Sequence, residues 1–515
     1  ASNTFTISNS AITPSLLGFS TGDTTSRDKL IQFIHGCDSY DENANGNTSE
    51  KREWILGAFI HSRPLILHYG SSRSVIYAGA NDGMLHAFDD ATGEELWAFI
   101  PPVLLPSLKD LTGESLAFFV DGSPKVYRTE STTVLLFGLR RGGNQYIALD
   151  ITDPLSPKYL WNISPSRTGF GELGQTWSTP QLGRIVIGSQ EKWVFFIGGG
   201  YDENQDNDPV SANDTKGRAV YVIDALTGDV VWSYTYAKNN LMRYSIPSDI
   251  TRVDTDGNGR IDRLYVGDMG GRMWRFDIGD PDSSKWTGKI IFNSSSGGVQ
   301  RKIFYPPDVT LEKDSGNYEM LFFGTGDREH PKAFGLLDRL YGLKDKNPSG
   351  PLGECDLVDV TEDLLQNPAT SATQKTSILE SLRAGNGWYI KLNENPGEKC
   401  LSNPVVFFGT VYYTTFTPDP GSESDICFVG EGTARIYAVN FKTGNAVFNL
   451  DAIGTINNLT RSDRSLVIGT VIPSGTIITF IGGTAVGYVG VGGGVYTPKL
   501  ATTKSLFPVN WRIVY

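Results

Sequence analysis

A short strand-turn-strand phrase returns along this chain at intervals of tens of residues, and this repetition limits which folds are possible. Copies begin at Tyr77, Gln145, Ala219, Leu264, Leu340 and Ala434. Each has an alternating apolar strand and a polar corner, often Thr-Gly, and most continue into a second strand that ends on an aromatic residue. Alternation is typical of a half-buried antiparallel strand, and Gly supplies the positive φ that a tight hairpin needs. The phrase therefore predicts a β-hairpin.

One hairpin cannot bury its apolar face alone, so successive hairpins must stack. Radial stacking of small sheets gives a β-propeller, whereas a solenoid would repeat with a shorter and stricter period. We predict an all-β chain that folds as a β-propeller of about seven blades, modified by insertions. The clearest helical pattern covers residues 361–383 and is interpreted as one such insertion.

The chain of 515 residues begins at Ala1, without a Met or the apolar stretch of a signal peptide. We therefore expect residues 51–515 to form the propeller and residues 1–50 to be a partly extended linker from a larger N-terminal region. A net charge of −12 without clustered Lys and Arg argues against nucleic acid as a partner. No apolar stretch is long enough for a transmembrane helix.

Four cysteines stand at Cys37, Cys355, Cys400 and Cys427. They lack the C-x-x-C spacing of a zinc or redox site, and their even number suits one or two disulfides in an exported protein. Cys400 with Cys427 is the preferred pair, because two apparent strands separate them and could bring them together. The alternative is free buried thiols in a cytosolic protein.

Residues 254–262 have the composition and spacing of a calcium-binding loop. Side-chain oxygens of Asp254, Asp256, Asn258 and Asp262, with the backbone carbonyl of Arg260, match loop positions 1, 3, 5, 9 and 7 of an EF-hand. Position 12, a Glu in EF-hands, is Tyr265 in an apolar run that reads as a strand. We predict an EF-hand-like Ca²⁺ loop in one blade, with micromolar to millimolar affinity. The alternative is a solvated acidic turn.

Other candidates are weaker. Residues 202–208 are acidic without a clear ligand pattern and favour a mobile surface loop, and residues 38–47 favour an exposed linker over a second Ca²⁺ loop. The histidines lack metal-ligand spacing and are interpreted as structural or surface residues: His35, His61, His68, His86 and His330. No group of residues suggests catalysis. We therefore expect that the protein is not an enzyme and has no catalytic or cofactor-binding residues.

Several strings together resemble one known family. They include LGAFIHSRP at 56–64, NDGMLHAFDDATGEELW within 77–101, FVDGSPKV at 119–126 and VDTDGNGRIDRLYVGDMGG within 253–278. In this combination they are similar to the C-terminal propeller domain of the PilC/PilY proteins, bacterial type IV pilus biogenesis factors and tip adhesins. Ala58 departs from the family's usual Asp in the first string, which leaves the role of that segment open.

The resemblance implies that the calcium site of the family falls on residues 254–262 and acts on the balance between pilus extension and retraction. It also implies roles in twitching motility and surface attachment, with minor pilins at the pilus tip, and host or abiotic surfaces, as partners. The expected location is the pilus tip or cell surface of a Gram-negative bacterium, with outer-membrane association or periplasmic transit. An N-terminal region that often contains a von Willebrand factor A-like module lies outside this chain.

Two alternatives belong to other classes. Residues 80–97 resemble the repeat of pyrroloquinoline-quinone dehydrogenases, which also bind Ca²⁺, but the chain has no adjacent Cys-Cys pair and keeps this phrase well in few blades. An outer-membrane assembly scaffold with a similar propeller would have no calcium loop.

Overall fold

The computed structural model describes residues 4–70, 73–113, 116–208, 210, 212–295, 299–313, 316–420, 432–453, 455–481 and 484–500. The chain divides into two compact units. The first unit contains residues 1–182 and 223–230, and the second contains residues 183–222 and 231–515.

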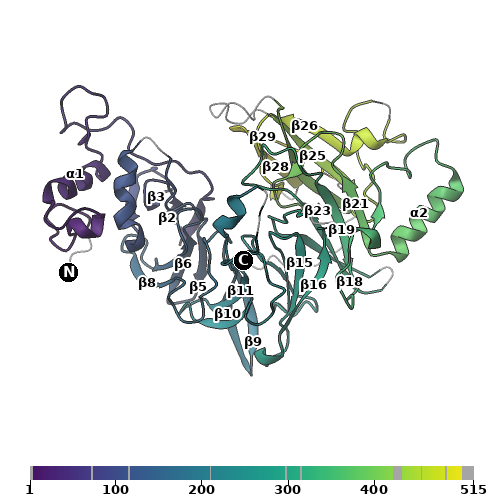
Figure 1. Cartoon of the computed structure of the whole chain (residues 1–515), viewed down its shortest axis with the longest axis horizontal. Helices are drawn as coiled ribbons and strands as arrows, with labels where there is room; N and C mark the ends of the chain where they lie inside the picture. Colours follow the sequence, from purple (N-terminus) through teal and green to yellow (C-terminus); the bar gives the residue numbers. More distant parts are fainter. Residues whose placement is uncertain are drawn as a thin grey trace. The chain divides into compact units, whose positions relative to one another are not determined.

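Strands that follow one another in sequence pair to form small sheets. The first sheet has the order β1 (Leu65–Tyr69), β2 (Arg73–Gly79), β3 (Leu85–Asp89), β4 (Glu95–Phe99). The second has the order β5 (Lys125–Arg128), β6 (Thr133–Gly138), β7 (Tyr146–Asp150), β8 (Lys158–Ile163). All pairs in both are antiparallel. These two sheets belong to the first unit (Figure 1).

The third sheet contributes residues to both units and has the order β12 (Val230–Thr235), β11 (Ala219–Asp224), β10 (Gln190–Gly198), β9 (Gln181–Ile187). The fourth, in the second unit, has the order β13 (Thr251–Val253), β14 (Arg263–Gly267), β15 (Arg272–Asp277), β16 (Thr287–Asn293). Its central strands are buried because both faces carry large apolar side chains such as Trp274 and Tyr265.

Three further sheets complete the second unit. The fifth contains β17 (Asp308–Glu312), β18 (Tyr318–Gly324), β19 (Arg339–Asp345), β21 (Gly387–Lys391) and a short parallel strand, β20 (Val358–Asp359). The sixth contains β22 (Lys399–Cys400), β23 (Val405–Phe407), β24 (Thr410–Pro418), β25 (Gly432–Asn440) and β26 (Ser465–Gly469). The seventh contains β27 (Ile477–Ile481), β28 (Thr484–Val491) and β29 (Gly494–Tyr496).

Seven sheets are thus present among the described residues, and most are built from four or five strands in the manner of a propeller blade. The predicted all-β class and the β-propeller of about seven blades are confirmed. The three Thr-Gly corners are hairpin turns with left-handed glycines, Gly93 at φ +74°, Gly228 at +69° and Gly444 at +70°. Gly93 connects β3 to β4 and Gly228 connects β11 to β12, so in these copies the repeated phrase is the hairpin of the third and fourth strands, at the edge of the blade.

Helices decorate the sheets. Among the described residues, the α-helices are α1 (Thr24–Ile34) and α2 (Ala372–Ala384). Short 3₁₀ helices are η1 (Pro14–Leu17), η2 (Pro102–Thr112), η3 (Glu203–Asp206), η4 (Ser283–Lys285), η5 (Glu354–Asp356) and η6 (Arg461–Arg464). Figure 1 shows α2 at the periphery of the second unit, as expected for an insertion. It begins later than the predicted 361–383 because Ser371 caps it, with Gln374 completing a capping box.

The segment expected to be a partly extended linker, residues 1–50, is in part helical. Asp23 caps α1 by accepting a hydrogen bond from the Ser26 N–H at 3.0 Å. Leu30, Ile31 and Phe33 are buried in the apolar cluster of the first unit. The segment is therefore part of the folded unit, since its helix has a core to pack against.

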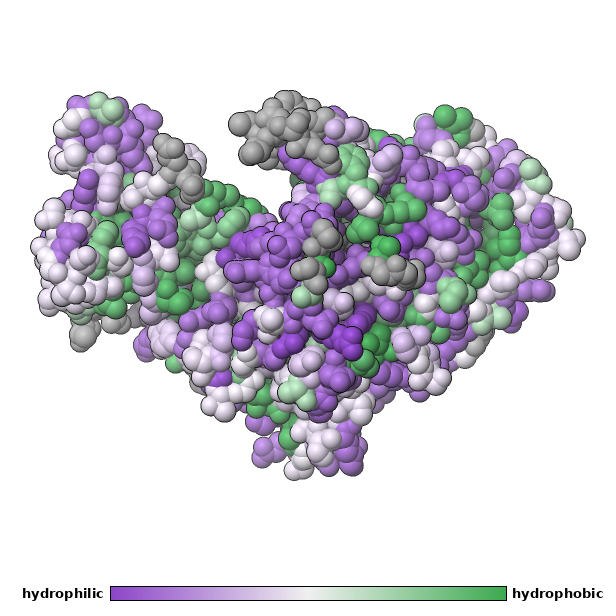
Figure 2. All heavy atoms as spheres, in the orientation of Figure 1, coloured by the Kyte–Doolittle hydropathy of each residue, from purple (hydrophilic) through white to green (hydrophobic). Residues whose placement is uncertain are grey.

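Apolar side chains fill the sheets, and polar ones dominate much of the surface. On the face drawn in Figure 2, hydrophilic residues cover most of the area and hydrophobic residues gather in separate patches. Exposed apolar side chains include those of Trp54, Ile55, Phe480 and Ile481. None of the helices in the described part of the chain has the length and apolar character needed to cross a bilayer.

Candidate metal centre

The acidic loop at 254–262 connects the first two strands of the fourth sheet. β13 and β14 pair antiparallel with Val253 opposite Arg263, so the nine residues between them form the loop of a hairpin. Ile261 is buried in the apolar cluster that also contains Trp274 and Phe276. Its N–H donates to the Arg184 carbonyl of β9 at 2.8 Å. The loop is therefore anchored at its C-terminal end while its acidic half faces solvent.

Asp254 holds the loop in its curved form. Its Oδ1 accepts hydrogen bonds from the N–H groups of Gly257 (2.7 Å) and Asn258 (3.1 Å), and its Oδ2 accepts one from Gly259 (2.6 Å). Gly257 at φ +78° and Gly259 at +84° have left-handed backbones that suit glycine. These two glycines let three successive N–H groups converge on one carboxylate.

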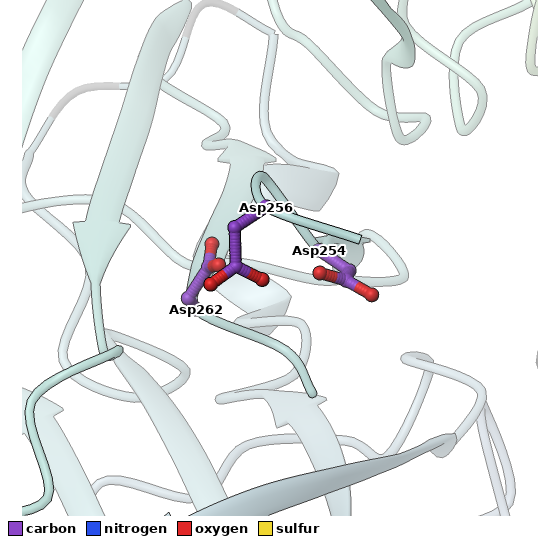
Figure 3. Close-up of side chains that lie close together, drawn as sticks. All are labelled: Asp254, Asp256 and Asp262. Atoms are coloured by element: carbon purple, nitrogen blue, oxygen red, sulfur yellow. The ribbon is translucent and has the colours of Figure 1, made fainter. Parts of the chain in front are cut away.

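The three predicted carboxylates lie together. Asp254, Asp256 and Asp262 have ligand oxygens within 4.8 Å of one another, and Figure 3 shows Asp256 drawn between the other two. Burial raises the pKa of Asp262, and the negative charges of Asp256 and Asp254 raise it further. Hydrogen bonds from the N–H and hydroxyl of Thr255 oppose this shift. The three carboxylates therefore repel one another when all are ionised, and a bound divalent cation would offset this repulsion.

The remaining predicted ligands are Asn258 and Arg260. The Asn258 Oδ1 accepts from the Arg260 N–H at 2.8 Å, and its amide group donates to the Asp256 Oδ2 at 2.9 Å. Within the part of the chain that the structure describes, no hydrogen bond ends on the Arg260 carbonyl oxygen. The guanidinium of Arg260 binds Glu191 instead of the loop carboxylates. The donors are all oxygens, which Ca²⁺ prefers, so these residues fit that ion.

Tyr265, at the twelfth position, is buried in β14, and its hydroxyl donates to the Asp345 Oδ2 at 2.6 Å. It does not reach the loop, so the site lacks the bidentate ligand of an EF-hand. A hollow of about 410 Å³ borders the loop instead, lined in part by Asp256, Arg260, Asp262 and Arg263. Four of the five predicted ligand residues, all except Asp254, line this hollow.

The acidic stretch at 202–208 is tied into the second unit. The Asp202 Oδ2 accepts from the N–H groups of Thr215 (2.6 Å) and Lys216 (2.8 Å). Asp214 accepts from Gln205 and from the Ser245 N–H. Asp202 is therefore buried and bonded to the backbone, whereas Asp206 and Asp208 are exposed, as a surface loop requires. The mobility of this loop stays a prediction.

The stretch at 38–47 forms a turn closed by hydrogen bonds to acidic side chains. The Glu50 Oε1 accepts from the side-chain amides of Asn43 (2.6 Å) and Asn45 (2.5 Å), and Asp41 accepts from the Gly46 N–H. Among the described residues, the one group of three or more His, Cys, Asp or Glu ligands placed for a metal is that of the 254–262 loop.

Cys427 of the preferred disulfide lies outside the described residues. Cys37, Cys355 and Cys400 form no disulfide with one another. Cys400 is buried in the second unit, and burial raises the pKa of its thiol to about 12. The pairing of Cys400 with Cys427 stays a prediction.

Sequence reasoning missed two residues that touch the loop. Arg184 in β9 donates to the Gly259 carbonyl oxygen from its Nε (3.4 Å) and Nη2 (3.3 Å), and Glu191 at the start of β10 binds Arg260. They precede the loop by dozens of residues, and no spacing connects them to it. Only the packing of β9 and β10 beside the hairpin brings them there.

The fold and site together define a β-propeller domain that carries an acidic, calcium-compatible hairpin loop in one blade. The family model described as the PilY1 beta-propeller domain matches residues 69–328, just over half of the chain. The chain belongs to this PilY1 β-propeller family.

Curated relatives agree with this assignment. The chain is 28% identical over 456 residues to a "Type IV pilus biogenesis factor PilY1 homolog" of Xylella fastidiosa (strain Temecula1), covering 80% of this chain and 34% of the relative. It is 28% identical over 547 residues to "Type IV pilus biogenesis factor PilY1" of Pseudomonas aeruginosa (strain PAK), covering 90% of this chain and 44% of the relative. The chain thus spans less than half the length of these relatives.

A solved structure shares the fold. The crystal structure of the Pseudomonas aeruginosa PilY1 C-terminal domain matches with a TM-score of 0.58 and 22% sequence identity, covering 82% of this chain and 92% of that one. At this identity the match supports the propeller fold.

Proposed function

We propose that this chain is the calcium-binding propeller domain of a type IV pilus biogenesis factor and tip adhesin. Ca²⁺ binds Asp254, Asp256, Asn258, the carbonyl of Arg260 and Asp262. Its occupancy regulates pilus extension against retraction, and through this twitching motility and attachment to surfaces. The partners are minor pilins at the pilus tip, together with host or abiotic surfaces. The protein acts after export, at the pilus tip or cell surface of a Gram-negative bacterium.

The observation that carries this proposal is the convergence of three carboxylates in a hairpin loop of the fourth sheet. Their mutual repulsion disfavours the ionised loop, and a divalent cation offsets it. The loop opens into a strand and not a helix, so a lever-like EF-hand opening has no moving part here. Occupancy instead orders a surface patch and neutralises its charge, which a partner can sense.

A non-enzymatic role fits the residues that resemble a quinoprotein repeat. Asp82 accepts from the Gly57 and Met84 N–H groups and contacts His86. The Trp97 indole donates to the Pro154 carbonyl oxygen at 2.7 Å. Asp82 thus closes the turn between β2 and β3, and Trp97 ties the first sheet to the turn between β7 and β8. Reconstitution with pyrroloquinoline quinone is expected to give no alcohol oxidation, and measurable turnover would favour the dehydrogenase alternative.

Calcium titration by calorimetry tests the site. The unaltered chain is expected to bind about one Ca²⁺ at this loop, with a Kd between micromolar and millimolar. Asp254→Ala removes a ligand and the acceptor of three loop N–H groups, so binding should be lost. Asp256→Asn keeps the shape and removes one charge, and it should weaken binding at least about tenfold. Asp90→Ala, on an exposed turn of another blade, is the control. Unchanged affinity in Asp254→Ala and Asp256→Asn would remove the proposed site.

The regulatory part is tested in the parent organism. Replacement of Asp262 by Ala in the full-length protein should change the amount of surface pili and the twitching zone, while the protein is still exported. Normal piliation and twitching in a variant that no longer binds Ca²⁺ would show that cation binding at this loop does not control the pilus.

A further inference from the structure

Arg260 places a positive charge in the middle of an anionic loop. Its backbone carbonyl is a proposed ligand, yet its side chain is half-exposed and borders the same hollow as Asp256 and Asp262. An arginine binds carboxylates strongly because its planar guanidinium donates two parallel hydrogen bonds. A guanidinium on a short tether is also present at a high effective concentration. Left free, Arg260 would compete with the cation for its ligands.

Glu191 holds this guanidinium away. Its Oε1 accepts from the Arg260 Nε at 2.9 Å and Nη2 at 2.7 Å. Glu191 is the second residue of β10 in the third sheet, whereas Arg260 lies in a loop of the fourth sheet.

The same carboxylate engages a second arginine. The Glu191 Oε2 lies 3.2 Å from the Arg184 Nη1, and Arg184 also donates to the Gly259 carbonyl oxygen. Ile261 binds the Arg184 carbonyl through its N–H. A Cβ on Gly183 would lie 2.9 Å from the Ile261 side chain, so the loop and β9 approach closely. The hairpin of β9 and β10 therefore packs against the loop and holds Glu191 beside it.

We propose that Glu191 is a positioning residue for cation binding, which keeps the loop carboxylates available by sequestering the Arg260 guanidinium on the neighbouring blade. This inference rests on the proposed calcium function of the loop. It assigns the β9–β10 hairpin a role in setting cation affinity. Loss of the Glu191 carboxylate releases Arg260, which then pairs with Asp256 or Asp262 and must be displaced by Ca²⁺.

The test is a set of variants titrated with Ca²⁺ by calorimetry. Glu191→Gln is expected to weaken binding about three- to tenfold, the strength of an exposed charge-assisted pair. Arg260→Gln removes the competitor but keeps the backbone carbonyl, so its affinity should equal or exceed that of the unaltered chain. The double variant should regain the affinity of Arg260→Gln, because no guanidinium remains to be sequestered.

A control separates this effect from the simple loss of a negative charge. Asp280→Asn removes a carboxylate close to the loop that pairs with Lys285 at 3.3 Å and not with Arg260. It should change the affinity less than about twofold. The inference is overturned if Arg260→Gln weakens binding as much as Glu191→Gln, or if the double variant stays as weak as Glu191→Gln. Absence of binding by the unaltered chain would overturn the calcium function and this inference together, whereas binding with the wrong variant order overturns this inference alone.

Discussion

At the scale of single residues, His86 shows how a propeller phrase is held together. It is buried in β3 of the first unit, with its Nε2 3.1 Å from the Asp82 Oδ2 and its Nδ1 beside the Glu95 carboxylate. Burial lowers its pKa, but the hydrogen bonds and charges of Asp82 and Glu95 outweigh this and raise it to about 9. The ring is therefore a protonated bridge between two acidic side chains.

This bridge predicts a pH dependence of stability. A histidine whose pKa is raised on folding contributes stability fully below its unfolded value of about 6.5, and loses it as the pH rises through about 9. Between pH 7 and 9.5 the free energy of unfolding should fall by about 2 kcal/mol through this group, allowing for solvent screening at half-exposed Glu95. Urea unfolding at both pH values measures the difference.

Two variants test whether His86 causes this pH dependence. His86→Gln should have a smaller loss of stability over this pH range than the unaltered chain, whatever its absolute stability. His68→Gln, which alters an exposed histidine, should keep the full loss. An equal loss in His86→Gln and the unaltered chain would show that other groups cause the pH dependence.

At the scale of elements, the Thr-Gly turns share a backbone conformation but differ in their surroundings. Gly93 and Gly228 both have left-handed φ values, +74° and +69°. A Cβ on Gly93 would meet no atom within 4 Å, whereas one on Gly228 would lie 2.5 to 2.7 Å from the ring of Trp161. That ring is fixed under the turn by its indole N–H, which donates to the Leu226 carbonyl oxygen at 2.6 Å.

A matched pair of substitutions separates the two effects. Gly93→Ala should cost about 1 kcal/mol, the price of a left-handed backbone for a residue with a Cβ. Gly228→Ala should cost about 2 to 4 kcal/mol, because the indole must also move. Denaturant unfolding measures both. Equal losses would mean that the Trp161 ring yields without cost.

At the scale of the whole molecule, Ca²⁺ binding should raise the free energy of unfolding. A ligand that binds only the folded state stabilises it by mass action, about 2.7 kcal/mol when free Ca²⁺ is 100 times Kd. The urea midpoint of the chain should therefore rise on adding Ca²⁺ and return on chelation. In Asp256→Asn the same Ca²⁺ concentration should have a much smaller effect. A Ca²⁺ response that persists in this variant would place the stabilising ion elsewhere.

The propeller and its loop could be predicted because their signals are local. Alternation, Thr-Gly corners and the spacing of Asp254, Asp256, Asn258 and Asp262 all act over a few residues, where strand geometry and ligand chemistry dictate the order of residue types. The helix α1 was not predicted. Its apolar residues gain stability from the core of the first unit, and isolated short helices are marginal without such packing.

The order of residue types along the chain is enough to predict the class of fold, the hairpin unit and the run of oxygen-bearing side chains in the acidic loop. The tertiary structure alone decided which groups surround that loop. Glu191 and Arg184 meet it because the third and fourth sheets pack side by side, and Tyr265 leaves it because β14 buries that side chain against Asp345. Such contacts join residues far apart in the chain, and their energies depend on packing and exposure that no local spacing records.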